Sequence, residues 1–220
     1  MAEKLRLRFS KKGKAVYISH LDLMRTMQRV FLRAGYALKY SEGFNPHPVI
    51  SILLPLGVGV SSECELMDFQ LSEPAALIDM PAALTVVMPE GIAALEVFPA
   101  ERKVNELKWL RIEGKLAYDN RQPDAIRDGL QSFFAQEPIV ILKKTKRGES
   151  ETDIAPAIRQ ICFTAEKSSV RLSAVISAQE PTLNPEHLLS ALRQHAPQLA
   201  PDYSEFTRVE VYDENLAVFR

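Results

Sequence analysis

Residues 19–48 of this 220-residue chain read SHLDLMRTMQRVFLRAGYALKYSEGFNPHP and predict a helix with both ends marked, followed by a proline-rich loop. The Ser19 hydroxyl can cap the free amides of the first turn, and Asp22, three residues later, suits a capping box. Apolar residues then recur at helical spacing and define a buried face. Gly35 stands where a left-handed C-terminal cap is expected. The stretch therefore predicts an amphipathic helix that begins at Ser19 and ends near Gly35.

The other face of this helix carries Arg25, Arg29 and Arg33, which are spaced four residues apart and are called the arginine ridge below. A guanidinium group binds phosphate through a bidentate fork, so the arginine ridge is a candidate surface for nucleic acid. The alternative interpretation is a helix face that is only solvated.

Residues 43–48, GFNPHP, form the second candidate feature and are called the GFNPHP loop. Pro46 and Pro48 push Asn45 and His47 into extended conformations, which holds the His47 imidazole in a stiff loop. We expect this loop to cover the start of the helix, so that His20, Asp22 and His47 lie near one another. His20 could also serve only as a partner of the backbone or of Asp22, and His47 could serve only to fix the loop. The candidate binding residues are Ser19, His20, Asp22, Arg25, Arg29, Arg33, Gly43, Phe44, Asn45 and His47.

The same residues carry a resemblance to a known family. Residues 8–51, RFSKKGKAVYISHLDLMRTMQRVFLRAGYALKYSEGFNPHPVIS, and residues 55–71, PLGVGVSSECELMDFQL, closely resemble the N-terminal part of the radical-SAM-linked proteins. That family is bacterial and functionally uncharacterised, and its members occur fused to, or encoded beside, a radical SAM protein. The resemblance continues through Asp153-Ile154 and Thr207-Arg208, but this chain has Ala155 where members usually carry arginine. The resemblance implies a radical SAM protein as partner.

Composition limits the class of protein and the chemistry it can perform. With 46% hydrophobic and 25% charged residues, the chain is typical of a globular protein, and no apolar run approaches the length of a membrane helix. The first residues lack the apolar core of a signal peptide, and Cys64 and Cys162 make no disulfide framework, so we expect a cytoplasmic protein. The chain has no Cys-x3-Cys-x2-Cys run, no phosphate-binding glycine loop and no His-Glu-x-x-His. We therefore expect no cofactor and no metal, and we assign any radical chemistry to another chain.

Charge is unevenly distributed along the chain. Residues 1–48 contain ten Lys or Arg and three acidic residues, which gives +7, whereas residues 49–100 contain seven acidic residues and no Lys or Arg. Such segregation can create a basic surface on a protein of nearly neutral overall charge. Alternatively, the two segments are adjacent in a sheet and neutralise each other.

The order of predicted elements indicates the fold. Strands are expected at residues 4–9, 49–54, 63–71 and 92–98, with helices from Ser19 and from Ser72-Glu73-Pro74. A similar order follows, with strands at 107–117, 138–142, 157–163, 170–177 and 206–212, and helices from Pro123 and Asn184; a basic turn at 143–148 joins two of these strands. We therefore predict an α+β fold of two ferredoxin-like split β-α-β units, with antiparallel sheets and helices on one face. The expected domains are residues 1–101 and 102–220.

Two functions of different classes fit these features. The first is a non-catalytic accessory or binding module that acts with a radical SAM enzyme and binds RNA through the basic N-terminal part. The second is a ribonuclease-like, RNA-processing enzyme that uses His20 or His47 as general acid or base, a layout similar to tandem ferredoxin-like endonucleases that process CRISPR RNA. The first is favoured because no second acid, base or nucleophile is visible beside either histidine.

Overall fold

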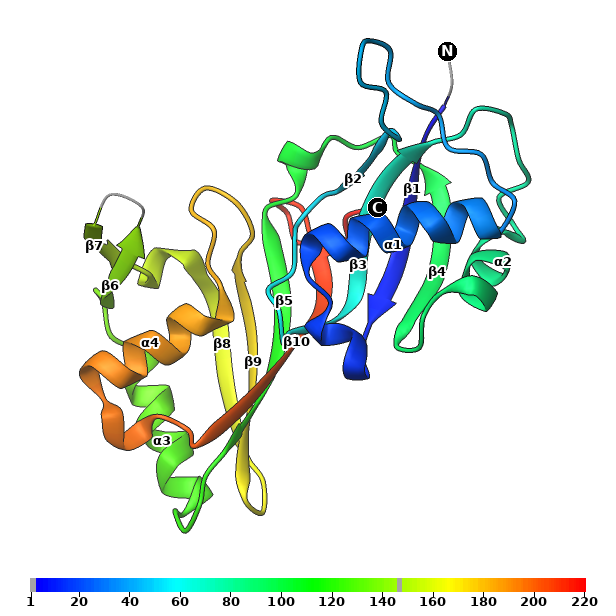
Figure 1. Ribbon diagram of the computed structural model, residues 1–220. Helices are drawn as coiled ribbons and strands as arrows, with labels where there is room; N and C mark the ends of the chain where they lie inside the picture. Colours follow the sequence, from blue (N-terminus) through cyan, green and yellow to red (C-terminus); the bar gives the residue numbers. More distant parts are fainter. Residues whose placement is uncertain (1–2, 146–147) are drawn as a thin grey trace. The chain divides into compact units, whose positions relative to one another are not determined.

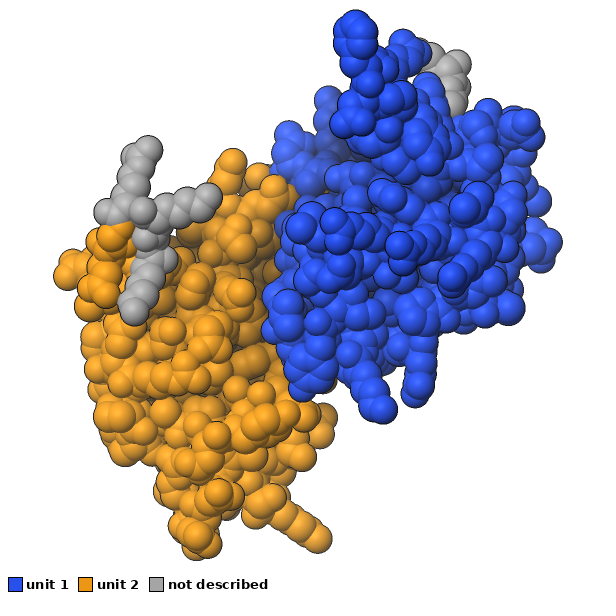
Figure 2. Space-filling view, viewed as in Figure 1, with its two compact units in different colours: residues 1–106, 220 blue, residues 107–219 orange. Residues whose placement is uncertain are grey.

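The computed structural model describes residues 3–145 and 148–220, and the chain divides into two compact units (Figures 1 and 2). Unit 1 comprises residues 1–106 with Arg220, and unit 2 comprises residues 107–219. The boundary predicted from the sequence follows residue 101. Within the described residues, no helix is long and apolar enough to cross a membrane.

The described part of unit 1 contains four strands and two α-helices in the order β-α-β-β-α-β: β1 (Lys4–Lys11), α1 (His20–Arg33), β2 (Ile50–Ile52), β3 (Ser61–Gln70), α2 (Met80–Val87) and β4 (Ile92–Pro99). The strands lie in the order β4-β1-β3-β2, and each neighbouring pair is antiparallel. One hydrophobic core joins the inward side chains of β1 to both helices, among them Leu7, Met27 and Leu84. Both helices therefore cover the same face of the sheet, which is the ferredoxin-like arrangement (Figure 1).

Unit 2 repeats this order: β5 (Trp109–Ala117), α3 (Pro123–Phe134), β8 (Ile158–Ala165), β9 (Ser169–Ser177), α4 (Pro185–His195) and β10 (Tyr203–Tyr212). Its strands lie in the order β10-β5-β9-β8, again antiparallel throughout. The predicted α+β fold with two ferredoxin-like units is thus confirmed.

A hairpin of β6 (Val140–Thr145) and β7 (Gly148–Asp153) is inserted between α3 and β8. The sequence predicts that a basic turn at 143–148 leads from the strand at 138–142 to the strand at 157–163; instead, residues 148–153 form a further strand, which pairs with β6. Two residues of the predicted basic turn, 146 and 147, lie outside the described residues.

Both ends of α1 follow the local sequence. The Ser19 side chain accepts a hydrogen bond from the Asp22 amide at 3.2 Å, so the predicted N-cap is confirmed. At the other end Gly35 has a φ of +81°, the Tyr36 amide donates to the Phe31 carbonyl, and the Gly35 amide donates to the Leu32 carbonyl. These two bonds form a Schellman motif, whose left-handed position favours glycine because it has no Cβ.

The helix predicted from residue 72 was misplaced, because α2 begins at Met80 and has Pro81 in its first turn. Pro74 and Pro81 suit a first turn equally well, since neither has the amide that this turn leaves free. The structure uses the second of them, because that helix brings Met80 and Leu84 into the core.

Candidate functional site

A short 3-10 turn, Gly13–Tyr17, leads from β1 into α1 and is held by a buried lysine. The Lys11 ammonium donates to the carbonyl oxygens of Val16 at 3.3 Å and Ile18 at 2.9 Å. Burial lowers the pKa of Lys11, and the Glu65 carboxylate acts in the opposite direction. This lysine therefore fixes the chain immediately before the predicted helix-start motif.

The structure brings three of the predicted site residues together at the start of α1. The Ser19 hydroxyl donates to the Asp22 carboxylate at 2.7 Å, and the same carboxylate accepts from Arg25 at 3.3 Å. The expected capping box is therefore modified, because Asp22 bonds the Ser19 hydroxyl rather than the Ser19 amide. The His20 side chain is exposed and makes no hydrogen bond or ion pair with any described residue.

The GFNPHP loop is closed by hydrogen bonds within its own base. The Ser41 amide donates to the His47 carbonyl at 2.9 Å, and the His47 amide donates to the Ser41 hydroxyl at 3.1 Å. The Nδ1 atom of His47 lies 3.0 Å from the Ser41 hydroxyl and 3.3 Å from the Asn45 carbonyl oxygen. These contacts fix the imidazole through Nδ1, while Nε2 bonds no described residue. Gly43 has a φ of +126°, and the Phe44 side chain next to it is fully exposed.

The base of this loop lies beside the second half of α1. A hollow of about 310 Å³, called the α1 hollow, is lined by Gln28, Arg29, Leu32, Tyr36, Ala37, Leu38, Tyr40 and Pro48. Arg29 is nine residues beyond His20, which is about 14 Å along a helix axis. No contact joins His20 or Asp22 to His47 among the described residues, so the single site that we predicted for these three side chains remains a prediction.

The pairing of β1 with β3 determines which of the cations in residues 1–48 are compensated by acidic side chains and which remain available to bind an anionic ligand. Arg6, which is buried, bonds Asp68 through Nε at 2.6 Å, and Lys4 reaches the same carboxylate at 2.6 Å. Lys12 pairs with Glu63 at 2.7 Å. The two oppositely charged segments therefore neutralise each other along this part of the sheet, as one of the two alternatives predicted.

Four other cations of residues 1–48 have no ion pair with a described residue: Lys14, Arg29, Arg33 and Lys39. Within the arginine ridge, Arg25 is paired with Asp22 at 3.3 Å, so Arg29 and Arg33 are the two members whose charge is uncompensated. Two of the four cations without an ion pair to a described residue, Arg29 and Arg33, therefore lie together in the second half of α1, whereas Lys14 precedes the helix and Lys39 follows it.

The sequence did not single out the apolar and aromatic side chains around these arginines. Leu32 is 77% exposed and Tyr40 is 56% exposed, although both are large hydrophobic residues. A signal was present in the sequence, since Leu32 lies off the buried face of the helix between Arg29 and Arg33. The surface therefore combines uncompensated guanidinium groups, a hollow lined by Tyr36 and Tyr40, and exposed Phe44 nearby in the chain.

This combination is suited to a ligand with anionic groups and flat apolar groups. Among the described residues, no group of three or more His, Cys, Asp or Glu side chains could hold a metal ion.

The fold and this surface define an α+β protein of two ferredoxin-like units with a cationic and aromatic face on the first. A family profile described as "Uncharacterized protein conserved in bacteria (DUF2344)" matches residues 4–185, and the chain belongs to that family. The description names no radical SAM protein. A search of curated proteins found no match.

Comparison with solved structures bears on the fold. A chain in the "Crystal Structure of a Cbf5-Nop10-Gar1 Complex" is 11% identical with a TM-score of 0.50, and the alignment covers 96% of this chain and 50% of that one. This chain thus spans about half the length of that solved chain, and the likeness concerns the fold alone.

Two further structures have lower scores. An unknown protein from Galdieria sulphuraria is 8% identical with a TM-score of 0.27, covering 97% of this chain and 99% of that one. Thermus thermophilus Cse3 bound to an RNA is 15% identical with a TM-score of 0.21, covering 92% and 98%. Scores this low support no conclusion about this chain.

Proposed function

We propose that this protein is a non-catalytic RNA-binding module, and that unit 1 binds single-stranded RNA through the arginine ridge, the α1 hollow and the GFNPHP loop. The observation that carries the proposal is the uncompensated charge of Arg29 and Arg33 on α1, together with the α1 hollow, which Arg29 and the exposed Tyr40 line. The adjoining GFNPHP loop adds the exposed ring of Phe44. Guanidinium groups bind phosphates, and aromatic side chains stack on unpaired bases.

The individual side chains take different parts in this proposal. Arg29 and Arg33 bind phosphates, whereas Arg25 is partly neutralised by Asp22 and contributes less. Phe44 has no packing in the free protein, so its full ring is available for stacking on a base. His47, fixed through Nδ1, offers Nε2 for a hydrogen bond to a base edge or to a phosphate. Ser19 and Asp22 hold the helix start, the Asn45 carbonyl contacts His47 within the loop, and Gly43 provides the positive φ of the turn.

The proposal includes a radical SAM enzyme as the partner and the cytoplasm as the location. The partner rests on the resemblance of the two motifs to radical-SAM-linked proteins, and the location agrees with two free cysteines. Co-purification from native cells tests the partner directly. Recovery of RNA without any radical SAM protein would remove the partner and leave the RNA proposal in place.

Binding of a fluorescent single-stranded RNA, measured by anisotropy across a salt series, tests RNA recognition. Exchanging Arg29 and Arg33 for Gln should make the log–log salt slope shallower by about 1.4, because each phosphate contact on a single strand contributes about 0.7. Phe44→Ala should weaken binding with the slope unchanged, since stacking releases no counterions. It should also leave thermal stability unchanged, because the ring is fully exposed.

A matched control removes the same number of charges from paired positions. The double variant Lys4→Gln and Lys12→Gln should keep the wild-type slope, because Asp68 and Glu63 already compensate these two cations. Equal changes in both double variants would show that only net charge matters and would reject the arginine ridge as a site. RNA cleavage by the purified chain that is lost in His47→Ala would favour the ribonuclease alternative instead.

A further inference from the structure

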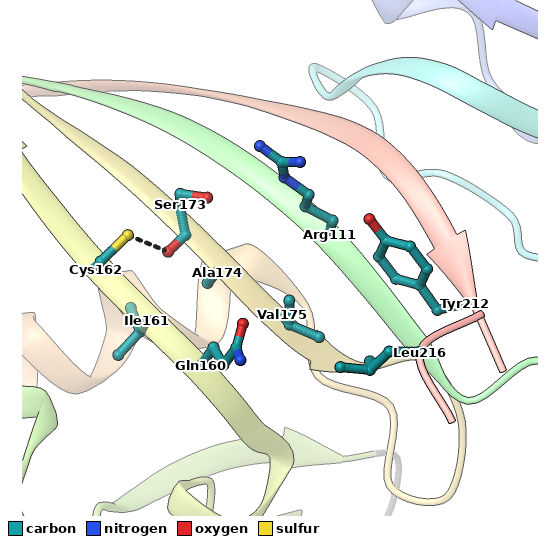
Figure 3. A pocket seen from close by; sticks show the side chains of 9 residues that line it. All are labelled: Arg111, Gln160, Ile161, Cys162, Ser173, Ala174, Val175, Tyr212 and Leu216. Carbon is teal, nitrogen blue, oxygen red and sulfur yellow. Dashed lines mark hydrogen bonds between the residues drawn. The ribbon is translucent and has the colours of Figure 1, made fainter. Parts of the chain in front are cut away.

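The face of the unit 2 sheet that points away from α3 and α4 contains a second hollow (Figure 3). Alternation along β5 places Leu110 and Ile112 in the core, and therefore Trp109 and Arg111 on this opposite face. The hollow has a volume of about 470 Å³ and is called the sheet hollow. Its side chains come from all four strands and from the turn after β10, and include Arg111, Gln160, Cys162, Ser173, Tyr212 and Leu216.

Polar groups with unused hydrogen-bonding capacity line this hollow. The Tyr212 hydroxyl, the Gln160 amide and the Ser173 hydroxyl make no hydrogen bond with any described residue. Arg111 uses one nitrogen to pair with Glu113 at 3.2 Å. Together with the aliphatic side chains of Val175 and Leu216, these groups offer a ligand both apolar contact and hydrogen bonds.

One wall of the sheet hollow is held in a strained conformation. Leu216 has a φ of +62°, which costs a residue with a Cβ about 1–2 kcal/mol. The turn is fixed by Asp213, whose carboxylate accepts from the amides of Asn215 and Ala217, both at 2.9 Å. This turn places the Leu216 side chain among the residues that line the hollow (Figure 3).

We propose that the sheet hollow is a second surface for single-stranded RNA, on which one base stacks against Tyr212 and the next base is bonded by Gln160 and Ser173. This inference rests on the proposed function, because it assumes that the protein binds RNA. The strands β10 to β8 span three strand spacings, or about 14 Å, which exceeds one base and suits a short run of nucleotides. The paired Arg111 is the single cation lining the described hollow, so stacking and hydrogen bonding dominate here, unlike at the arginine ridge.

The alkylation rate of Cys162 can measure whether the sheet hollow is occupied. Cys162 is exposed and lines the hollow, whereas Cys64, the other cysteine, is buried. Wild-type protein saturated with a single-stranded oligonucleotide, as shown by anisotropy, should be alkylated by N-ethylmaleimide at Cys162 several-fold more slowly than free protein. An unchanged rate in the saturated complex would overturn the sheet hollow and leave RNA binding by unit 1 intact. Failure of anisotropy to detect any RNA binding would reject the proposed function itself.

A substitution gives an independent measurement. Tyr212→Ala should weaken RNA binding by about 5- to 100-fold with the salt slope unchanged, the range expected for loss of one stacked base. Tyr212→Phe keeps the ring and should retain most of the affinity, which separates stacking from misfolding. Tyr203 is an exposed tyrosine on the same strand and face but outside the hollow, so Tyr203→Ala should bind as wild type.

A small ligand is the competing occupant of this hollow. If adenosine or uridine monophosphate protects Cys162 as completely as the oligonucleotide at equal concentration, the occupant is a small molecule and the RNA assignment is wrong.

Discussion

The buried ion pair between Arg6 of β1 and Asp68 of β3 gives the sharpest test of how acidic residues of β3 neutralise the basic residues 1–48. The Arg6 side chain has no exposed surface and that of Asp68 is 4% exposed, while Lys4, the other partner of Asp68, is 53% exposed. Asp68→Ala removes the carboxylate that accepts two hydrogen bonds from a buried guanidinium, at 2.6 and 3.2 Å. Removing one partner of a buried pair costs about 3–5 kcal/mol, and we expect this loss in the free energy of unfolding.

Substitution of Arg6 should cost less stability than substitution of Asp68. In Arg6→Met, the Asp68 carboxylate keeps its contact with the exposed Lys4, so we expect a smaller cost of about 1–3 kcal/mol. The double variant Arg6→Met with Asp68→Leu should be more stable than Asp68→Ala, because it buries no charge at this position. Lys12→Gln breaks an exposed pair and serves as the control, with an expected cost below about 1 kcal/mol.

Urea denaturation followed by far-UV circular dichroism measures these differences, and hydrogen exchange of the β1 and β3 amides assigns them to unit 1. An Asp68→Ala variant no less stable than Lys12→Gln would refute the reasoning.

Two further predictions concern individual positions. Gly91→Ala should destabilise the protein more than Gly59→Ala in thermal unfolding: both glycines have positive φ, but a Cβ at Gly91 would lie 2.3 Å from a backbone oxygen, whereas one at Gly59 would meet nothing. Burial lowers the pKa of His187, whose Nδ1 accepts the Asn184 amide in the capping box of α4, so the unfolded state binds the proton first as pH falls. Stability should therefore decrease as pH falls from about 6.5 through the lowered pKa, and His187→Gln should flatten this dependence while His20→Gln leaves it in place.

The sequence by itself determined the features that depend on neighbours within one turn or one strand. Ser19, Gly35 and Asn184 mark helix ends in the structure as predicted, because capping bonds join residues only two to five positions apart. The order of strands and helices was sufficient to predict two ferredoxin-like units, since few topologies accommodate that order twice.

Tertiary structure alone decided which of several equally suitable local signals is used. Pro74 and Pro81 can each open a helix, and only packing of Met80 and Leu84 into the core selects the second. Residues 138–142 had an apolar strand pattern, but the pattern does not specify a partner, and the structure pairs this segment with residues 148–153.

In the candidate site, too, the local sequence determined some features and the tertiary structure decided the others. The arginine ridge follows from helical spacing, but the sequence could not show that β3 neutralises Lys4, Arg6 and Lys12 and leaves Arg29 and Arg33 uncompensated. Ion pairs across a sheet depend on strand register, which joins residues more than fifty positions apart. The α1 hollow and the sheet hollow likewise form from side chains of separate elements, so they exist only once those elements have packed.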